Sequence, residues 1–155
     1  MSLVSRIRSV LQPLAGSGEA AALRKKGTDY NRAGKYAEAV QAYEHALEKD
    51  PNNAETWHDR GIALGMMGKQ SAALTSFDRA LAIDRKFSRS WGARGNVLSA
   101  MGKHQEALSS FDRALALNPK DGITWYHKGK TFEAMGKAND AAVCFKTAQE
   151  KGYKP

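Results

Sequence analysis

Residues 57–84 read WHDRGIALGMMGKQSAALTSFDRALAID, and residues 91–118 read WGARGNVLSAMGKHQEALSSFDRALALN. The two stretches align without an insertion when the first is moved forward from Trp57 to Trp91, and an equal step leads on to Trp125. A fixed period of this length is typical of proteins that stack copies of one small structural unit. The pattern divides the chain into four blocks, namely residues 20–53, 54–87, 88–121 and 122–155.

Each block is predicted to form two antiparallel helices. The first helix carries a large apolar residue, a glycine four positions later and another apolar residue three positions after that, which places all three on one face. A glycine inside a helix costs roughly 1 kcal/mol relative to alanine, so the repeated glycine indicates a place where the facing helix comes close. These residues are Leu23, Trp57, Trp91 and Trp125; Gly27, Gly61, Gly95 and Gly129; and Tyr30, Leu64, Leu98 and Phe132.

A second glycine column predicts the end of each first helix, because glycine readily takes the left-handed conformation that closes a helix. The second helix then shows a small residue, an aromatic residue four positions later and a small residue three positions further on, a stripe suited to packing on the first helix. The glycines are Gly34, Gly68, Gly102 and Gly136, and the aromatic residues are Tyr43, Phe77, Phe111 and Phe145. Asn53 and Asp121 are expected to cap the helices that follow them.

Composition excludes several functional classes. The 155 residues carry a net charge of +8, but the excess is spread over all four blocks, as on a solvated helical surface, which argues against nucleic acid as a partner. Cys144 is the only cysteine, so the chain forms no internal disulfide and is interpreted as cytoplasmic. No run of eighteen apolar residues is present, which argues against a membrane-spanning helix.

Residues 1–19 are expected to form an N-terminal amphipathic helix and a linker. Leu3, Val4, Ile7, Val10, Leu11 and Leu14 make a helical stripe, Pro13 is expected to end or kink the helix, and residues 15–18 are interpreted as a flexible joint. Three roles remain open for the helix. It packs on the end of the first block, it docks in the groove of its own or a neighbouring molecule, or it lies on an anionic membrane surface through residues 3–14.

The spacing Trp-x3-Gly-x2-(Leu/Phe), followed by Gly, Ala-x3-Phe-x2-Ala and Pro, resembles the tetratricopeptide repeat (TPR) and covers residues 20–155. The resemblance implies an all-α fold, a right-handed superhelical α-solenoid of tandem helix-turn-helix repeats. Arg85 departs from the pattern because it stands where proline is expected, and we therefore expect a looser turn there. Four cations also stand where the family has an apolar residue. These cations are Lys26, Arg60, Arg94 and Lys128. Either the aliphatic parts of their side chains cover the edge of the core, or the four charges form a basic ladder for an acidic partner.

The resemblance also implies that ligands bind on the concave surface, formed by the first helix of each pair. The positions assigned to peptide binding are Arg24, Thr28, Asn31, Arg32, His58, Ile62, Met66, Arg89, Asn96, Tyr126, Lys130 and Glu133. This mixed set suggests a peptide with acidic and aliphatic residues. The clamp by which relatives hold chaperone C-terminal tails maps to Arg24, Thr28, Asp59, Arg89 and Ala93, where Asp59 has the wrong charge, so such a tail is disfavoured.

No catalytic or metal-binding constellation is evident. His45, His58, His104 and His127 fall in four different columns, and Cys144 has no thiol partner, so no catalytic residue, metal or cofactor is predicted. The predicted function is a non-catalytic scaffold or adaptor that binds a peptide segment of a partner protein. The alternatives are a self-assembling module, a homo-oligomer in which the N-terminal helix docks in its own or a neighbour's groove, and a basic surface for anionic membrane or nucleic acid.

The last block is more polar than the others on its second helix. Leu47, Leu81 and Leu115 are followed in this column by Gln149, so the array is expected to end here with a helix that faces water. We expect no additional capping helix of the kind that is usual in the family. Val143 and Tyr153 are therefore expected to be partly exposed or used in dimerisation.

Overall fold

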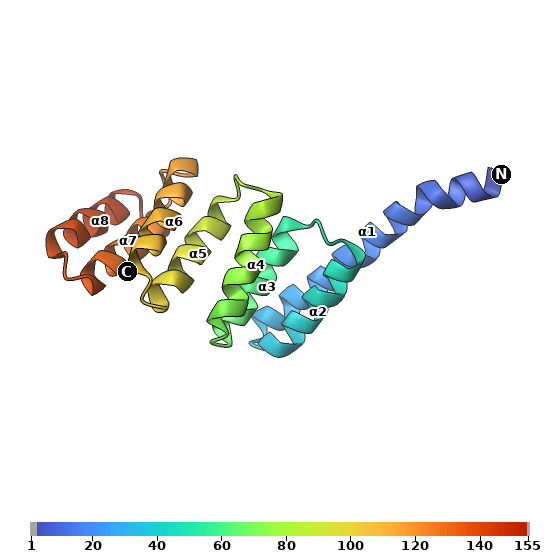
Figure 1. Cartoon of the computed structure of the whole chain (residues 1–155), viewed down its shortest axis with the longest axis horizontal. Coiled ribbons are helices and arrows are strands. Elements are labelled where there is room, and N and C mark those ends of the chain that lie inside the picture. The colour runs from blue at the N-terminus through green and yellow to red at the C-terminus, as the bar shows by residue number, and fades with distance from the viewer. Residues whose placement is uncertain (1–2, 155) are drawn as a thin grey trace.

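The computed structural model describes the backbone from Leu3 to Lys154 and the side chains from Gly16 onwards. This part of the chain contains eight helices and no strand. The helices form four pairs that follow one another along the long axis of the molecule, which confirms the all-α solenoid (Figure 1). Their bounds are α1 (Leu3–Arg32), α2 (Tyr36–Lys49), α3 (Ala54–Met66), α4 (Gln70–Ile83), α5 (Ser88–Ala100), α6 (His104–Leu117), α7 (Gly122–Ala134) and α8 (Ala138–Glu150). Within the described chain, no helix is both long and apolar enough to span a bilayer.

Within each pair, an aromatic ring of the second helix lies directly on a glycine of the first. A Cβ atom added to Gly27, Gly61, Gly95 or Gly129 would stand 2.6–2.7 Å from a ring carbon of Tyr43, Phe77, Phe111 or Phe145, respectively. Carbon atoms do not approach so closely, so no side chain fits between the helices at these points. The glycine column is therefore required by helix packing, as the sequence predicts.

The second glycine column closes the first helices. Gly34, Gly68, Gly102 and Gly136 all have φ between 72° and 74°, a conformation that other residues rarely adopt. The residue after each glycine donates a backbone hydrogen bond to a carbonyl group in the last turn of the helix, as from Lys35 N to Tyr30 O at 2.9 Å. The predicted helix ends are confirmed, and the four turns have the same shape.

The tryptophans bind the turns between consecutive pairs. Trp57, Trp91 and Trp125 are half-buried, and each indole N–H donates a hydrogen bond to a carbonyl oxygen of the turn that precedes its helix. The acceptors are Pro51 at 2.9 Å, Arg85 at 3.0 Å and Pro119 at 3.2 Å. Since the turn that contains Arg85 makes the same hydrogen bond as the turns that contain proline, the looser turn expected there is not found.

Helix α1 has no break. It runs from Leu3 to Arg32, so the helix does not end at Pro13, and residues 15–18, which were expected to form a flexible joint, are helical. Gly16 lies against α2, because a Cβ atom there would stand 3.9 Å from the carbonyl oxygen of Lys49, and Glu19 forms an ion pair with Lys49 at 3.3 Å. These contacts hold the helical segment where a linker was expected. The side chains of the predicted apolar stripe lie outside the described residues.

Two glycines of α3 give a direct test of the packing. An added Cβ at Gly61 would meet the Phe77 ring at 2.7 Å, whereas an added Cβ at Gly65 would meet only Ala73 Cβ, at 4.0 Å. We expect Gly61→Ala to lower the free energy of unfolding by about 1–3 kcal/mol through overpacking. Gly65→Ala should raise it by roughly 0.5–1 kcal/mol, because alanine favours the helix. Urea unfolding of both variants measures the difference, and equal effects would contradict the packing explanation.

Candidate binding surface

The side chains predicted to line the concave surface lie along α1, α3, α5 and α7, here called the first-helix surface. Nine of the twelve line three hollows, at the N-terminal end, in the centre and at the C-terminal end of the array, whereas Asn31, His58 and Arg89 line none of these three.

The central hollow lies between α3 and α5 and has a volume of about 220 Å³. Three predicted residues meet here, since Ile62 and Met66 come from α3 and Asn96 comes from α5. Met66 is 60% exposed, which is unusual for so large an apolar side chain. The rest of the lining is mostly apolar and consists of Gly61, Gly65, Gln70, Phe77, Ala93, Val97 and Ala100. The contributions of Gln70, Ala93 and Val97 were not predicted from the sequence.

Gly65 keeps this hollow open. Its position in the repeat is held by Asn31, Ser99 and Glu133 in the other three blocks, so the solenoid does not require glycine there. An added Cβ would make only an ordinary contact with Ala73, unlike one at Gly61. Helix packing therefore gives no reason for Gly65, and its effect is to leave space beside Ile62 and Met66.

Near the N-terminal end, two arginines predicted to hold ligand carboxylates are already paired within the protein. Arg24 forms ion pairs with Glu55 at 2.6 Å and with Asp59 at 3.0 Å, while Arg89 lies 3.9 Å from Glu55. Burial raises the pKa of Asp59 although Arg24 donates a hydrogen bond to it. Partial burial acts to lower the pKa of Arg24. The nearby carboxylates of Asp59 and Glu55 outweigh this effect, so the pKa of Arg24 is raised overall. Arg24 is therefore a bridge between α1 and α3.

His58 does not lie on the open surface, which corrects its predicted role as a ligand contact. It is only 7% exposed, and its Nδ1 lies 2.9 Å from Ser90 Oγ, so that it joins α3 to α5. The rings of Phe77 and Phe87 lie against it. Burial, and then the positive charge of Arg89, lower the pKa of His58 to about 4. It is accordingly a neutral, structural histidine.

The other N-terminal positions are partly occupied by internal contacts. Thr28 donates to the carbonyl oxygen of Arg24 at 3.1 Å and accepts a hydrogen bond from the Tyr43 hydroxyl at 3.4 Å. Asn31 has a buried Oδ1 with no hydrogen-bond partner among the described residues. Arg32 is exposed and lines a hollow of about 400 Å³ together with Arg24 and Thr28.

The C-terminal hollow, of about 330 Å³, contains the last three predicted residues. Tyr126, Lys130 and Glu133 line it together with residues of α8, and Lys130 and Glu133 form an ion pair. Tyr153, which was not assigned to this surface, stacks on Tyr126 with ring centroids 4.6 Å apart. Gly152 makes this possible, since its φ of 86° turns the chain back towards α7.

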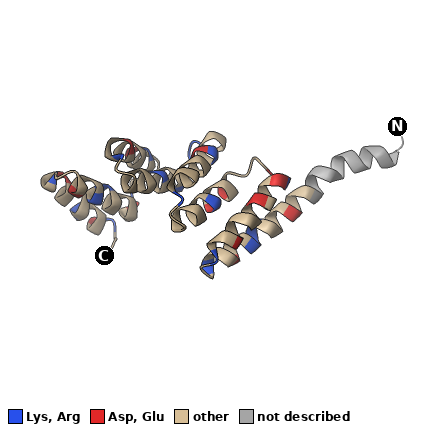
Figure 2. Cartoon of the chain, turned by 60° about the horizontal axis from the view of Figure 1, so that its bottom comes forward, with Lys and Arg blue, Asp and Glu red and all other residues tan. Residues whose placement is uncertain are grey.

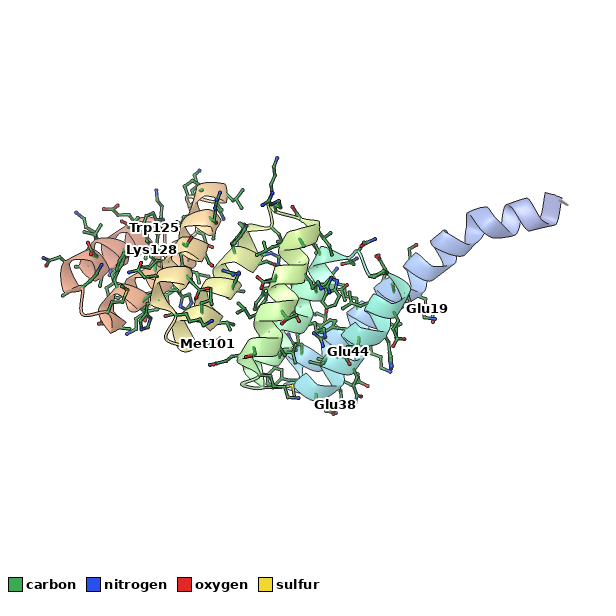
Figure 3. The ribbon with its side chains drawn as sticks, in the orientation of Figure 1. Glu19, Glu38, Glu44, Met101, Trp125 and Lys128 are labelled. Atoms are coloured by element: carbon green, nitrogen blue, oxygen red, sulfur yellow. The ribbon has the colours of Figure 1, made fainter. Side chains whose placement is uncertain are left out.

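Three of the four cations that stand in place of apolar residues are paired within the protein and do not form an open basic ladder, whereas Lys26 is exposed and lies 5.7 Å from the ring centroid of Tyr30. Arg60, Arg94 and Lys128 each pair with a carboxylate of the preceding second helix at 2.7–2.8 Å, and each lies 5.2–5.9 Å from the ring centroid of the tryptophan three residues earlier. Figure 3 shows this proximity for Trp125 and Lys128. The carboxylates belong to Glu44, Asp78 and Asp112. Figure 2 shows the two signs of charge interspersed over the array.

Two of these cations make a further contact. Arg60 donates to Ser76 Oγ at 2.8 Å and Arg94 to Ser110 Oγ at 2.7 Å, so that each guanidinium connects three helices. The equivalent of Ser76 in the last block is Cys144, which is buried, and burial raises the pKa of its thiol. Cys144 is therefore a protonated core residue. No group of three His, Cys, Asp or Glu side chains within the described part of the chain is placed to hold a metal ion.

Comparisons with known proteins agree with this architecture. A family model described as TPR repeat matches residues 27–68, and one described as Tetratricopeptide repeat matches residues 88–121. No curated protein matches the chain.

Several solved structures are similar over most of the chain. The crystal structure of MamA is 25% identical with a TM-score of 0.80, over 93% of this chain and 83% of that one. The first TPR of Spaghetti (RPAP3), bound to the HSP90 peptide SRMEEVD, is 28% identical with a TM-score of 0.75, over 77% of this chain and 95% of that one. YrrB, a TPR protein with an unusual peptide-binding site, is 23% identical with a TM-score of 0.76, over 86% of this chain and 69% of that one, and this likeness concerns the fold alone.

The buried His58 predicts a pH dependence of stability. The unfolded chain binds a proton on His58 as the pH falls below 6.5, whereas the folded protein does so only near pH 4. The free energy of unfolding should therefore fall with pH in this window, and the contribution of His58 at pH 5 is a loss of about 2 kcal/mol. Burial also lowers the pKa of His127, which adds to the loss in the same direction.

Urea unfolding between pH 7 and pH 5 tests this contribution. The loss of stability should be smaller by about 2 kcal/mol in His58→Gln than in the unmodified protein. The exposed His45 provides the control, and His45→Gln should leave the loss nearly unchanged. An equal loss in His58→Gln and His45→Gln would show that His58 is not the source.

Proposed function

Since the chain belongs to the tetratricopeptide repeat family, we propose that it is a non-catalytic scaffold that binds a peptide segment of a partner protein on the first-helix surface. The observation that carries this proposal is the central hollow between α3 and α5, which is apolar, open and kept free by Gly65. Among the three hollows of the surface, this one is lined without any charged side chain.

The central hollow has the chemistry of a site for an apolar peptide side chain. Ile62, Met66 and Val97 offer apolar contact, and burial of a Leu-sized side chain contributes about 1.5–3 kcal/mol. Asn96 and Gln70 stand at the same hollow, and an amide group both donates to and accepts from a peptide backbone. An extended segment with one aliphatic or aromatic anchor fits this arrangement.

The acidic part of the predicted ligand has weaker support than the aliphatic part. Arg24 and Lys130 are held in ion pairs by Asp59 and Glu133, respectively, which leaves the exposed Arg32 and the weakly paired Arg89 for carboxylates. The neighbour bound to an HSP90 peptide supports peptide binding as the general function. This support does not extend to chaperone C-terminal tails as ligands of this chain, because Asp59 occupies a position of the carboxylate clamp and forms an ion pair with Arg24.

Filling the hollow should weaken peptide binding without loss of the fold. Peptides of twelve random residues, displayed on phage, are first selected on the full chain, and the affinity of the selected sequences is then measured by fluorescence anisotropy. Gly65→Leu should weaken binding by roughly tenfold or more, because its side chain takes the place of the peptide anchor. Gly65→Ala should weaken binding less while stabilising the helix.

Lys69→Ala provides the control, since Lys69 is exposed in the turn after α3 and does not line the central hollow. Its affinity for the selected peptides should equal that of the unmodified protein. Circular dichroism checks that Gly65→Leu remains folded. The proposal fails if no peptide is enriched, or if folded Gly65→Leu binds the enriched peptides as tightly as before.

A further inference from the structure

A hollow of a different character lies between α6 and the turn that precedes α5. It has a volume of about 360 Å³ and is lined by Arg85, Trp91, Arg113, Ala116 and Leu117. It shares no residue with any of the three hollows of the first-helix surface. The lining thus contains two arginines and no acidic residue, and the arginines lie beside an indole ring and an apolar wall. Leu117, which belongs to this wall, is 41% exposed.

The turn does not need an arginine at position 85. Its carbonyl oxygen accepts the hydrogen bond from Trp91 just as Pro51 and Pro119 accept theirs, and within the described chain the backbone N–H of Arg85 donates to no backbone carbonyl group. Proline would therefore satisfy the turn equally well. The observable consequence of arginine is a cation at the hollow.

The charges around the hollow leave its two arginines without a partner. Asp78 pairs with Arg94 at 2.8 Å, and Asp112 pairs with Lys128 at 2.7 Å. Asp84 accepts the backbone N–H of Lys86 at 2.9 Å. Within the described residues, the guanidinium groups of Arg85 and Arg113 form neither an ion pair nor a hydrogen bond, whereas four other cations of the same two blocks, Arg60, Arg89, Arg94 and Lys103, each lie in an ion pair.

The equivalent places in the array lack this combination. Moving the five lining positions back by one repeat gives Pro51, Trp57, Arg79, Ala82 and Ile83, and moving them forward gives Pro119, Trp125, Thr147, Glu150 and Lys151. The first set contains a single cation, Arg79, and the second set contains a glutamate, Glu150. Among these three equivalent places, two unpaired arginines beside an indole occur only at the hollow between α6 and the turn that precedes α5.

We propose that this hollow is a second docking site, which binds an acidic peptide segment that carries an apolar side chain next to its carboxylates. Arg85 and Arg113 bind the carboxylates through charge-assisted hydrogen bonds, and the apolar side chain packs on Trp91, Ala116 and Leu117. A nucleic acid strand fits less well. The ring of Trp91 is half-buried and has Arg94 5.9 Å from its centroid, so it offers no open platform for base stacking.

The probe is an acetylated and amidated pentapeptide, Glu-Leu-Glu-Leu-Glu, added to the isotopically labelled full chain up to millimolar concentration. The three tryptophan indole N–H signals report separately on Trp57, Trp91 and Trp125 in a proton–nitrogen correlation spectrum. The Trp91 signal should shift and the other two should stay in place. The matching peptide with Gln in place of Glu should shift none of them.

Two substitutions and one control locate the site. Arg85→Pro restores the residue of the neighbouring turns, and Arg113→Gln keeps a polar side chain, so both should fold and both should weaken binding by about tenfold. Arg79→Gln, one repeat before Arg113, should have no effect. The site is overturned if the Trp91 signal does not shift, if folded Arg85→Pro and Arg113→Gln bind the probe unchanged, or if a single-stranded oligonucleotide binds more tightly than the peptide at equal ionic strength. Gly65→Leu should bind the probe normally, so this test is independent of the central hollow.

Discussion

The close contact between a glycine and an aromatic ring governs this structure. At four equivalent points a ring of the second helix occupies the space that a Cβ atom of the first helix would otherwise fill. Because proteins are packed as densely as organic crystals, this contact fixes the distance and the rotation between the two helices of a pair. The position of every other side chain on the first helix, including those that face a ligand, follows from that rotation.

The fold could be predicted because its determinants recur at a fixed interval. Gly61 and Phe77 are informative as members of columns, and Gly68 marks a helix end in the same way. The error at residues 15–18 has a local origin. Two glycines and a serine are typical of a joint, but Gly16 packs beside the end of α2 and Glu19 pairs with Lys49, so tertiary contacts override the preference of the isolated segment.

The binding surface could be predicted only in part, because its details depend on pairs of residues from different repeats. Arg24 and Asp59 both fall at surface positions of the pattern, yet they form an ion pair with each other and so are not free to pair with a ligand. His58 is buried because Phe87, in a turn of irregular sequence, lies against its ring. Periodicity assigns a residue to a face of its helix, but it does not show which neighbour will cover that face.

The contacts of the cation column differ between the middle and the ends of the array. Arg60 and Arg94 each reach a serine in the second helix of their own pair, whereas the first and last blocks have Lys26 with Ala42 and Lys128 with Cys144. In a solenoid each unit is stabilised only by its own packing and by its immediate neighbours. The first and last pairs, which lack this arginine–serine bond, should therefore open locally before the centre does, and the central junctions should exchange their amide protons most slowly.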